Sequence, residues 1–487
     1  MASSSATRID ASEGEIMTRC YDFFKETCKF PHGSYNEKQL SDYLVEFAKK
    51  NDLKVIQDDM FNVVIYKDAT PGYEDHDTLM LQAHMDMVDE KNKESNHDFT
   101  KDPIEIIEME DGWIKANGTT LGADDGIGTA YMLAILEDKT LEHPALECVF
   151  TVQEEVGLFG AMNLKAEYFK AKNAISLDGG DEKTLLSSAG GRRVEIKIPM
   201  GCQPVHTKGL RIMVRGLQGG HSGGSIDKEL GNSNKIMGRV LYHLQKAVDI
   251  RLVSIEGGSK DNAIPRENDA VIAYDEKDHD QVLAIIKKQE EDIFALLEFS
   301  DAGFKLSVEE ETVSQSMSKY NTKQFIRFLY LLPNGLISKS MNIPGLTLTS
   351  LNVGVISCNE VSIVIHLSLR SAYNESIDEM TYSIKELCDL FEYSMSTDSS
   401  YPGWRYKEIN PLRDVICEIY KDMTGNEMEK VAAHGGNECG ILESILDNPN
   451  IANLGPCMKY IHTPQETLQL ESFDRMYDVL VNVIKRL

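Results

Sequence analysis

The sequence predicts an α/β protein in which one three-layer domain, a sheet flanked by helices, is interrupted by a long α+β insertion. In the first 187 residues, short β-branched apolar runs alternate with amphipathic helical segments, as expected when helices cover a sheet. Beyond Ser187 the helices lengthen and mix with strand-like runs, and the α/β pattern returns after Tyr401. Acidic side chains follow several apolar runs, where open α/β sheets place their ligands.

The first part of the chain predicts three helices and five strands from the period of its apolar residues. Breaks such as Phe30-Pro-His-Gly-Ser34 separate these segments. The helices are expected at 13–29, 37–51 and 127–137, and the strands at 53–57, 62–66, 78–83, 149–152 and 174–178.

The insertion predicts strands and longer helices that could form two successive α+β units divided near Ser300. These are strands at 193–198, 210–214 and 361–369, and helices at 232–247, 279–298, 322–332 and 377–395. Helices at 410–424 and 471–486 close the chain. The predicted organisation is therefore residues 1–187 and 399–487 as two parts of one domain, with 188–398 inserted between them.

Composition excludes several classes of function. The chain has 487 residues, with Lys+Arg 50 against Asp+Glu 78 and a formal charge of -28, which disfavours nucleic acid and anionic membranes as partners. It contains no apolar run of the ~20 residues that a membrane helix needs. The start, Met1 to Arg8, lacks the apolar core of a signal peptide. Nine dispersed cysteines without a Cys-x-x-Cys pair indicate a reducing, cytoplasmic setting.

Two adjacent acids, Glu154 and Glu155, follow the apolar run 149–152, so a buried strand would deliver both carboxylates to its end. Buried carboxylates need a partner charge or a metal. Because neighbours in a strand point to opposite faces, both can serve one site only if the strand has ended there. His84 and Asp86 share a face of an extended segment, so Asp86 could orient a metal-binding His84. A surface histidine beside an acid is the ordinary alternative.

Three further residues are ambiguous singly. Asp124, before a predicted helix, could be an N-cap, Asp178 could be a turn residue, and His462 could be an unremarkable loop histidine. Together with the residues above they form the inventory of a two-metal hydrolytic site. Histidine and carboxylate ligands suit zinc, with cobalt or manganese as alternatives.

The order of these motifs resembles the M20 family of metallopeptidases along nearly the whole chain. The stretches Tyr401-Pro-Gly-Trp404 and His434-Gly-Gly-Asn-Glu-Cys-Gly440, with the long insertion, resemble its aminoacyl-histidine (cytosol non-specific) dipeptidase branch. The resemblance implies a zinc-peptidase catalytic domain and an inserted domain of the lid or dimerisation type. The site motifs that carry it are His84-x-Asp86, Gly122-Ala-Asp-Asp-Gly126, Glu154-Glu155, Asp178 and His462.

The resemblance also implies a role for each residue of the predicted site. Asp124 would bridge two divalent metal ions, with His84 and Asp178 completing one ligand set and Glu155 and His462 the other. Glu154 would be the general acid/base that takes a proton from a metal-bridging water, and Asp86 would orient His84. Many relatives carry Lys or Asn where Asp125 stands, and an extra acid there could alter metal affinity.

Three residues of the insertion resemble residues that contact the substrate. His221, in Gly219-Gly-His-Ser-Gly223, resembles the residue that stabilises the tetrahedral oxyanion. Asn262 and Arg370 resemble substrate-binding residues, with Arg370 a clamp for the C-terminal carboxylate. Two of them have a plainer alternative: a flexible turn for the glycine-rich loop that carries His221, and a structural ion pair for Arg370.

The resulting hypothesis is a two-metal dipeptidase that cleaves unblocked dipeptides, including carnosine-like Xaa-His substrates. Alternatives are a related tripeptidase, carboxypeptidase or N-acyl amino acid amidohydrolase, and a non-catalytic binding protein. The expected partner is a short peptide. In the wider family the inserted domain commonly pairs two subunits, which makes a homodimer through that domain one expectation. The alternative is that the long insertion supplies His221 from the same chain.

Overall fold

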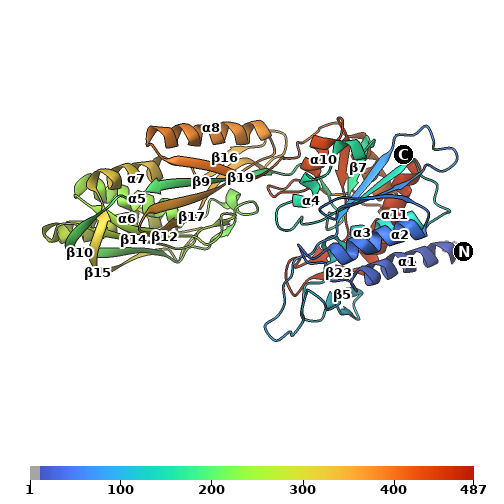
Figure 1. Cartoon of the computed structure of the whole chain (residues 1–487), viewed down its shortest axis with the longest axis horizontal. Coiled ribbons are helices and arrows are strands. Elements are labelled where there is room, and N and C mark those ends of the chain that lie inside the picture. The colour runs from blue at the N-terminus through green and yellow to red at the C-terminus, as the bar shows by residue number, and fades with distance from the viewer. Residues whose placement is uncertain (1–10) are drawn as a thin grey trace, which may run out of the picture. The chain divides into compact units, whose positions relative to one another are not determined.

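The computed structural model describes residues 11–487, so the signal-peptide interpretation of the first eight residues lies outside it. The chain forms two compact units. Figure 1 shows that one of them combines blue and red segments, from the two ends of the chain, whereas the other consists of its middle. Unit 1 comprises residues up to Ser187, Tyr406–Val431 and Asn437–Leu487, and unit 2 comprises Ser188–Arg405 and Ala432–Gly436.

Unit 1 is built on a six-stranded mixed sheet of order β1-β2-β6-β3-β7-β21. Its last four strands are parallel, so their carboxyl ends meet at one edge. All residues of β3 and β6 are buried, which requires that both faces of the sheet are covered. The strands are β1 (Lys54–Gln57), β2 (Val63–Lys67), β3 (Leu79–His84), β6 (Leu146–Thr151), β7 (Asn173–Ser176) and β21 (Asn450–Asn453).

Helices cover this sheet and bury a continuous apolar core. Phe24, Tyr131 and Phe473 are fully buried where three helices meet, and each contributes about 1.5–3 kcal/mol by leaving water. A four-stranded sheet, β22-β23-β5-β4, accompanies the main one. The helices are α1 (Ala11–Thr27), α2 (Lys38–Lys50), α3 (Ala123–Glu137), α4 (Phe159–Met162), α9 (Pro411–Thr424), α10 (Cys439–Ile445) and α11 (Leu470–Arg486), and the strands are β4 (Ile106–Glu108), β5 (Trp113–Ala116), β22 (Met458–Lys459) and β23 (Thr467–Gln469).

Unit 2 contains one nine-stranded sheet of order β15-β10-β14-β12-β17-β18-β9-β19, with β16 on β17. Strands from before and after Ser300 are interleaved in this sheet, so it does not divide at the boundary expected there. Its elements are β9 (Gly190–Pro199), β10 (Cys202–Arg215), β12 (Arg251–Gly257), β14 (Asn268–Ala273), β15 (Lys305–Met317), β16 (Gly335–Lys339), β17 (Thr347–Cys358), β18 (Ser362–Ser371), β19 (Ser394–Tyr401), and helices α5 (Ser233–Ala247), α6 (His279–Leu297), α7 (Lys319–Leu331) and α8 (Asn374–Leu390).

The helix predicted at 377–395 is wrong at its end. Apolar residues continue the helical spacing through Phe391 and Met395, but the chain turns at Glu392, whose φ is 58°. The next strand, β19, pairs with β9, and Met395 lies opposite Ile196. Pairing along the sheet therefore overrides the local period.

The α/β class with helix-flanked sheets is confirmed. Unit 1 ends its first part at Ser187, the residue where the sequence pattern changes, and the second transition falls after Arg405 rather than at 398. Residues 432–436 belong to unit 2, and no change in amino-acid composition at these positions predicts this assignment. Within the part of the chain that the structure describes, no helix is long and apolar enough to cross a membrane.

Candidate metal centre

The Glu154-Glu155 pair lies in a turn just beyond β6. The strand ends at Thr151, and Gln153 adopts a left-handed conformation with φ of 55°. The N–H groups of Gly157 and Leu158 then both donate to the Glu154 carbonyl at 3.0 Å. The strand has therefore ended before the two acids, which is the condition under which both can serve one site.

The Asp86 carboxylate holds this turn in place. It accepts hydrogen bonds from the backbone N–H of Glu154 at 3.0 Å and of Glu155 at 3.3 Å, and from the Ser34 hydroxyl at 2.7 Å. Nδ1 of His84 lies 2.9 Å from the Asp86 backbone carbonyl and 3.6 Å from its carboxylate. The expected orienting contact thus comes mainly from the backbone of Asp86, while its side chain positions the two glutamates.

The Asp124 carboxylate lies between two imidazole rings. Its Oδ1 is 3.2 Å from His84 Nε2 and its Oδ2 is 3.1 Å from His462 Nε2, which also lies 2.9 Å from Glu155 Oε1. Two ligand atoms on one tetrahedral zinc ion are roughly 3.3 Å apart, because zinc–nitrogen and zinc–oxygen bonds measure about 2.0–2.2 Å. The spacing of these side chains therefore fits ligands of two ions that share Asp124.

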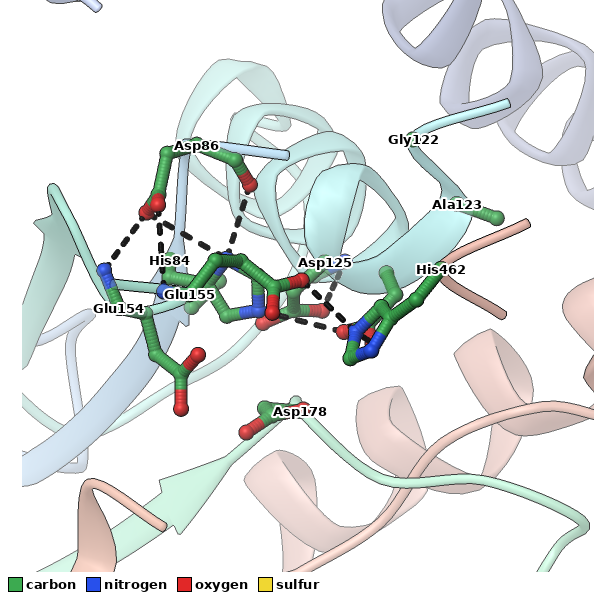
Figure 2. A network of polar contacts seen from close by, with 12 residues as sticks. His84, Asp86, Gly122, Ala123, Asp125, Glu154, Glu155, Asp178 and His462 are labelled. Atoms are coloured by element: carbon green, nitrogen blue, oxygen red, sulfur yellow. Dashed lines mark hydrogen bonds and ion pairs between the residues drawn. The ribbon is translucent and has the colours of Figure 1, made fainter. Parts of the chain in front are cut away.

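The structure brings together all the candidate ligands of unit 1. Figure 2 shows His84, Glu155 and His462 gathered at the start of α3, with Asp178 at the end of β7. Among the residues that the structure describes, donor atoms within 4.8 Å of one another form three groups: His84, Asp124 and Asp178; Asp124, Glu155 and His462; and His84, Glu154 and Glu155. The first two groups contain the same residues as the two ligand sets that the family resemblance implies.

The two histidines favour the charged form when no metal is present. Burial works against a charge on His84, but the hydrogen bond with Asp124 and the nearby Asp86 carboxylate outweigh it and hold the pKa well above its usual value. Hydrogen bonds with Asp124 and Glu155 raise the pKa of His462 to about 11. Burial opposes ionisation of Asp124, yet His462 and His84 keep the pKa of its carboxyl low.

Unlike Asp124, the acids Glu154 and Asp178 have raised pKa values. Burial, followed by repulsion from Glu155, raises the pKa of Glu154 well above its usual range. Burial and the Asp124 charge do the same to the pKa of Asp178. If all four carboxylates are ionised, their charge exceeds that of two protonated imidazoles, and divalent cations would offset the excess. The donor set therefore fits two such cations.

Asp125 has a different task from Asp124, to which a cis peptide bond joins it. Its Oδ1 accepts a hydrogen bond from the Gly128 N–H at 3.2 Å, and the side chain is 99% buried, with a relative exposure of 1%. This is an N-cap interaction at the start of the regular part of α3. The extra acid is thus directed to the helix rather than to the histidines.

Two buried acids near the site had no predicted chemical role, although Glu438 was expected to line or support the cleft. Glu438 accepts hydrogen bonds from the Thr151 hydroxyl at 2.7 Å and from the Gln82 amide, so it joins the ends of β6 and β3. Glu466 accepts from backbone N–H groups at the start of α3. Asn437, which directly precedes Glu438, donates to Asp178 Oδ2 at 3.0 Å. Only the spacing of Glu466, four residues after His462, could have hinted at its place.

Unit 2 contains the three residues expected to contact substrate, and they lie close together. The Asn262 carbonyl accepts from the Ser222 N–H at 2.8 Å, and Arg370 Nε donates to the Ser222 hydroxyl at 3.3 Å. Nδ1 of His221 accepts from the N–H groups of Gly223 at 3.1 Å and Gly224 at 3.3 Å. Burial and Arg370 lower the pKa of His221, so its ring is neutral with the proton on Nε2.

Metal binding at this centre is expected to release protons. Adding Zn²⁺ to metal-free protein at pH 7 should release at least two, because both histidines carry a proton that a metal ligand must lose, and the raised pKa of Asp178 lets this carboxyl add to the number. Binding should weaken as pH falls. In the metal-free protein, the stabilisation from His462 is complete below the ordinary pKa near 6.5 and is lost as pH rises through about 11. Calorimetry in two buffers of different ionisation enthalpy measures the number.

Two variants test whether the released protons come from the metal-binding histidines. His143 is buried and its pKa is lowered by that burial, so His143→Gln should leave proton release unchanged. His462→Gln should reduce it by about one proton. Equal release from both variants would show that His462 does not give up a proton to the metal.

Comparison with known proteins gives consistent results. The model for peptidase family M20/M25/M40 matches residues 80–486. The chain is 33% identical over 473 residues to cytosol non-specific dipeptidase of Escherichia coli (strain K12), covering 96% of this chain and 97% of that protein. A crystal structure of aminoacylhistidine dipeptidase from Vibrio alginolyticus has a TM-score of 0.87 at 30% identity, with 96% of each chain covered. A Staphylococcus aureus tripeptidase shares the fold, with a TM-score of 0.55 at 17% identity over 96% of this chain and 98% of its own.

The match to the family model spans most of the chain, and the dipeptidase relative aligns over almost its full length. The resemblance expected from the order of the motifs is therefore confirmed. This chain belongs to peptidase family M20/M25/M40.

Proposed function

We propose that this protein is a two-metal dipeptidase that hydrolyses unblocked dipeptides, Xaa-His substrates among them. The observation that carries the proposal is the Asp124 carboxylate, which presents one oxygen to His84 and the other to His462. The names of two relatives, a cytosol non-specific dipeptidase and an aminoacylhistidine dipeptidase, support the substrate class.

His84, Asp178 and the shared Asp124 would hold one ion, and Glu155, His462 and Asp124 the other. Mixed imidazole and carboxylate ligands suit zinc, with cobalt and manganese as alternatives. Two divalent ions bound there would lower the pKa of the attacking water and polarise the carbonyl of the scissile bond.

Glu154 is the proton carrier of the proposed reaction. Its carboxylate takes a proton from the attacking water and passes it to the nitrogen of the leaving amine as the C–N bond breaks. Burial favours the protonated form of Glu154, which suits the second transfer, and nearby cations favour the ionised form that starts the first. Asp86 keeps Glu154 in place by accepting its backbone N–H.

His221 would stabilise the oxyanion that forms from the substrate carbonyl. The two backbone N–H groups at its Nδ1 leave the other ring nitrogen as the hydrogen-bond donor. A neutral donor of this kind strengthens its bond as negative charge develops on oxygen. Its lowered pKa maintains that neutral state at physiological pH.

Arg370 would bind the C-terminal carboxylate of the substrate, and Asn262 would contact the backbone of the substrate. Contacts at 3.3 Å with the Ser222 hydroxyl and with the Tyr401 hydroxyl orient the buried guanidinium group. A guanidinium can bind a carboxylate through two parallel hydrogen bonds. A fixed clamp for the terminus would limit the substrates to dipeptides.

A substrate panel tests the proposed activity. Metal-free protein is loaded with Zn²⁺, Co²⁺ or Mn²⁺, and amino acid release is measured from β-Ala-His, other dipeptides, a tripeptide and an N-acetyl amino acid. The dipeptides should be hydrolysed fastest. Preference for the tripeptide or the N-acyl compound would instead indicate a tripeptidase or an amidohydrolase, and metal binding without turnover would indicate a binding protein.

Arg370→Lys is expected to raise KM for a dipeptide about 10- to 100-fold, with a smaller change in kcat, because a lysine cannot form the paired hydrogen bonds. Steady-state kinetics on a dipeptide and on its C-terminal amide measures the effect. The amide should be a poor substrate for both proteins. Arg192→Lys is the control, since Arg192 pairs with Asp378 at 2.8 Å in the same unit. An equal loss on both substrates would contradict the clamp.

We further propose that unit 2 is a lid and dimerisation domain and that the protein works in the cytoplasm, as the name of the Escherichia coli relative indicates for that protein. Light scattering after size-exclusion chromatography measures the mass. Mixing His221→Ala and Glu154→Gln chains tests whether the histidine acts across subunits, because restored activity requires sharing.

A further inference from the structure

The Glu466 carboxylate accepts hydrogen bonds from four successive backbone N–H groups, the last of which belongs to Asp124, the proposed shared ligand. Its Oε2 accepts from the N–H groups of Leu121 at 2.8 Å and Gly122 at 3.2 Å, and its Oε1 from those of Ala123 at 2.8 Å and Asp124 at 3.3 Å. Gly122, with φ of 71°, provides the left-handed conformation that lets successive N–H groups converge on one anion. The side chain of Glu466 is buried, with a relative exposure of 2%.

These N–H groups would otherwise attract the nearest acid of their own segment. Aspartate at the start of a helix commonly accepts from local backbone N–H groups, since the exposed donors and the helix dipole favour an anion there. Here Asp125 accepts from Gly128, and Glu466 takes the four donors that precede it. The carboxylate of Asp124 is thereby left to contact His84 and His462.

One short loop makes two separate contacts with Asp124. His462 Nε2 lies 3.1 Å from its Oδ2, and Glu466, four residues later, accepts its backbone N–H. The Glu466 N–H donates to the Thr463 carbonyl at 3.0 Å, which closes the loop between them. The position of the Asp124 backbone and the distance from its side chain to His462 are therefore set by the same segment.

We propose that Glu466 is a positioning residue for the metal centre, one that keeps the Asp124 carboxylate off the helix start and directed at both histidines. This inference rests on the proposed role of Asp124 as the shared ligand. Outer partners of metal ligands typically change metal affinity by 10- to 100-fold when they are removed. Glu466→Gln places an amide NH₂ group against backbone donors, so the ring of hydrogen bonds cannot remain complete.

The experiment compares Glu466→Gln with Glu147→Gln. Glu147 is a matched control because it is a buried acid of unit 1 that accepts backbone N–H groups, from Lys170 at 2.8 Å and Ala171 at 3.2 Å. Zinc affinity is measured by chelator competition, and stability by thermal unfolding of the metal-free proteins. We expect Glu466→Gln to bind zinc at least about 10-fold more weakly, with kcat recovering at high zinc, and Glu147→Gln to bind as the wild type does.

Three outcomes would overturn the proposal: unchanged zinc affinity in Glu466→Gln, an equal loss in Glu147→Gln, or a kcat deficit that excess zinc does not reduce. If Glu466→Gln does not fold, Glu466→Asp decides instead. It keeps the charge but is shorter by one methylene, so it should reach fewer N–H groups and weaken zinc binding to a smaller degree. Wild-type zinc affinity in Glu466→Asp would also overturn the proposal.

Asp124→Asn, measured in parallel, separates this inference from the proposed function. Weak zinc binding in Asp124→Asn with wild-type binding in Glu466→Gln would leave the proposed function intact and reject only the positioning role. Wild-type zinc binding in Asp124→Asn would reject Asp124 as the shared ligand and, with it, the route by which Glu466 is proposed to act.

Discussion

Glu154→Gln is expected to lower kcat for dipeptide hydrolysis by about 10²- to 10⁴-fold, because a glutamine cannot accept a proton from the attacking water or return one to the leaving amine. The shape of the side chain is retained, and the backbone N–H of residue 154 can still donate to Asp86. Two metal ions per chain should remain bound, since Glu154 is not among the proposed ligands. Steady-state kinetics and elemental analysis after dialysis measure both quantities.

Glu147→Gln provides the control for the loss of a buried carboxylate elsewhere in unit 1. It should retain wild-type kcat, because Glu147 accepts backbone N–H groups at the opposite end of β6 from the Glu154 turn. Near-normal turnover in Glu154→Gln would remove it as the proton carrier. Loss of metal in that variant would assign it a ligand role instead and reopen the choice between Glu154 and Glu155.

Several candidate ligands could be predicted from local sequence signals, whereas Asp124 and His462 are ambiguous singly and are assigned through the family resemblance. Asp178 and the Glu154-Glu155 pair come directly after buried apolar runs, and parallel strands place such ends at one edge of a sheet. His84 is the last residue of β3, which is a third neighbour at that edge. A strand period and the order of a few polar residues are sufficient to bring these side chains together.

The supporting contacts could not be predicted, because they join residues that are distant in the sequence. Glu466 contacts the start of α3 and the two residues before it across 342–345 positions, and Glu438 contacts Gln82 across 356. Neither acid follows an apolar run that would mark it. Asp86 shows a different limit: β3 ends at His84, so the alternation of faces no longer applies two residues later and its carboxylate turns to Glu154 and Glu155.

Asp124→Asn is expected to have the largest effect on metal binding. Asparagine keeps the size of the side chain but has one carbonyl oxygen, so it can contact one ion only and its NH₂ group faces the second. The negative charge between two cations is lost as well. Zinc affinity should therefore fall by more than the roughly 10- to 100-fold that follows loss of an outer partner, with a matching loss of activity. Chelator competition and metal content after dialysis measure the change.

Asp125→Asn is the matched control for Asp124→Asn. Asp125 accepts from the Gly128 N–H, and asparagine caps helices about as well as aspartate, so Asp125→Asn should preserve the fold. Burial and the neighbouring acids Asp178 and Asp124 raise the pKa of Asp125 well above its usual range, so a neutral amide there relieves repulsion that the charged side chain experiences. Zinc content should stay at two ions per chain. If Asp125→Asn lost metal as Asp124→Asn does, the division of tasks between these adjacent acids would be wrong.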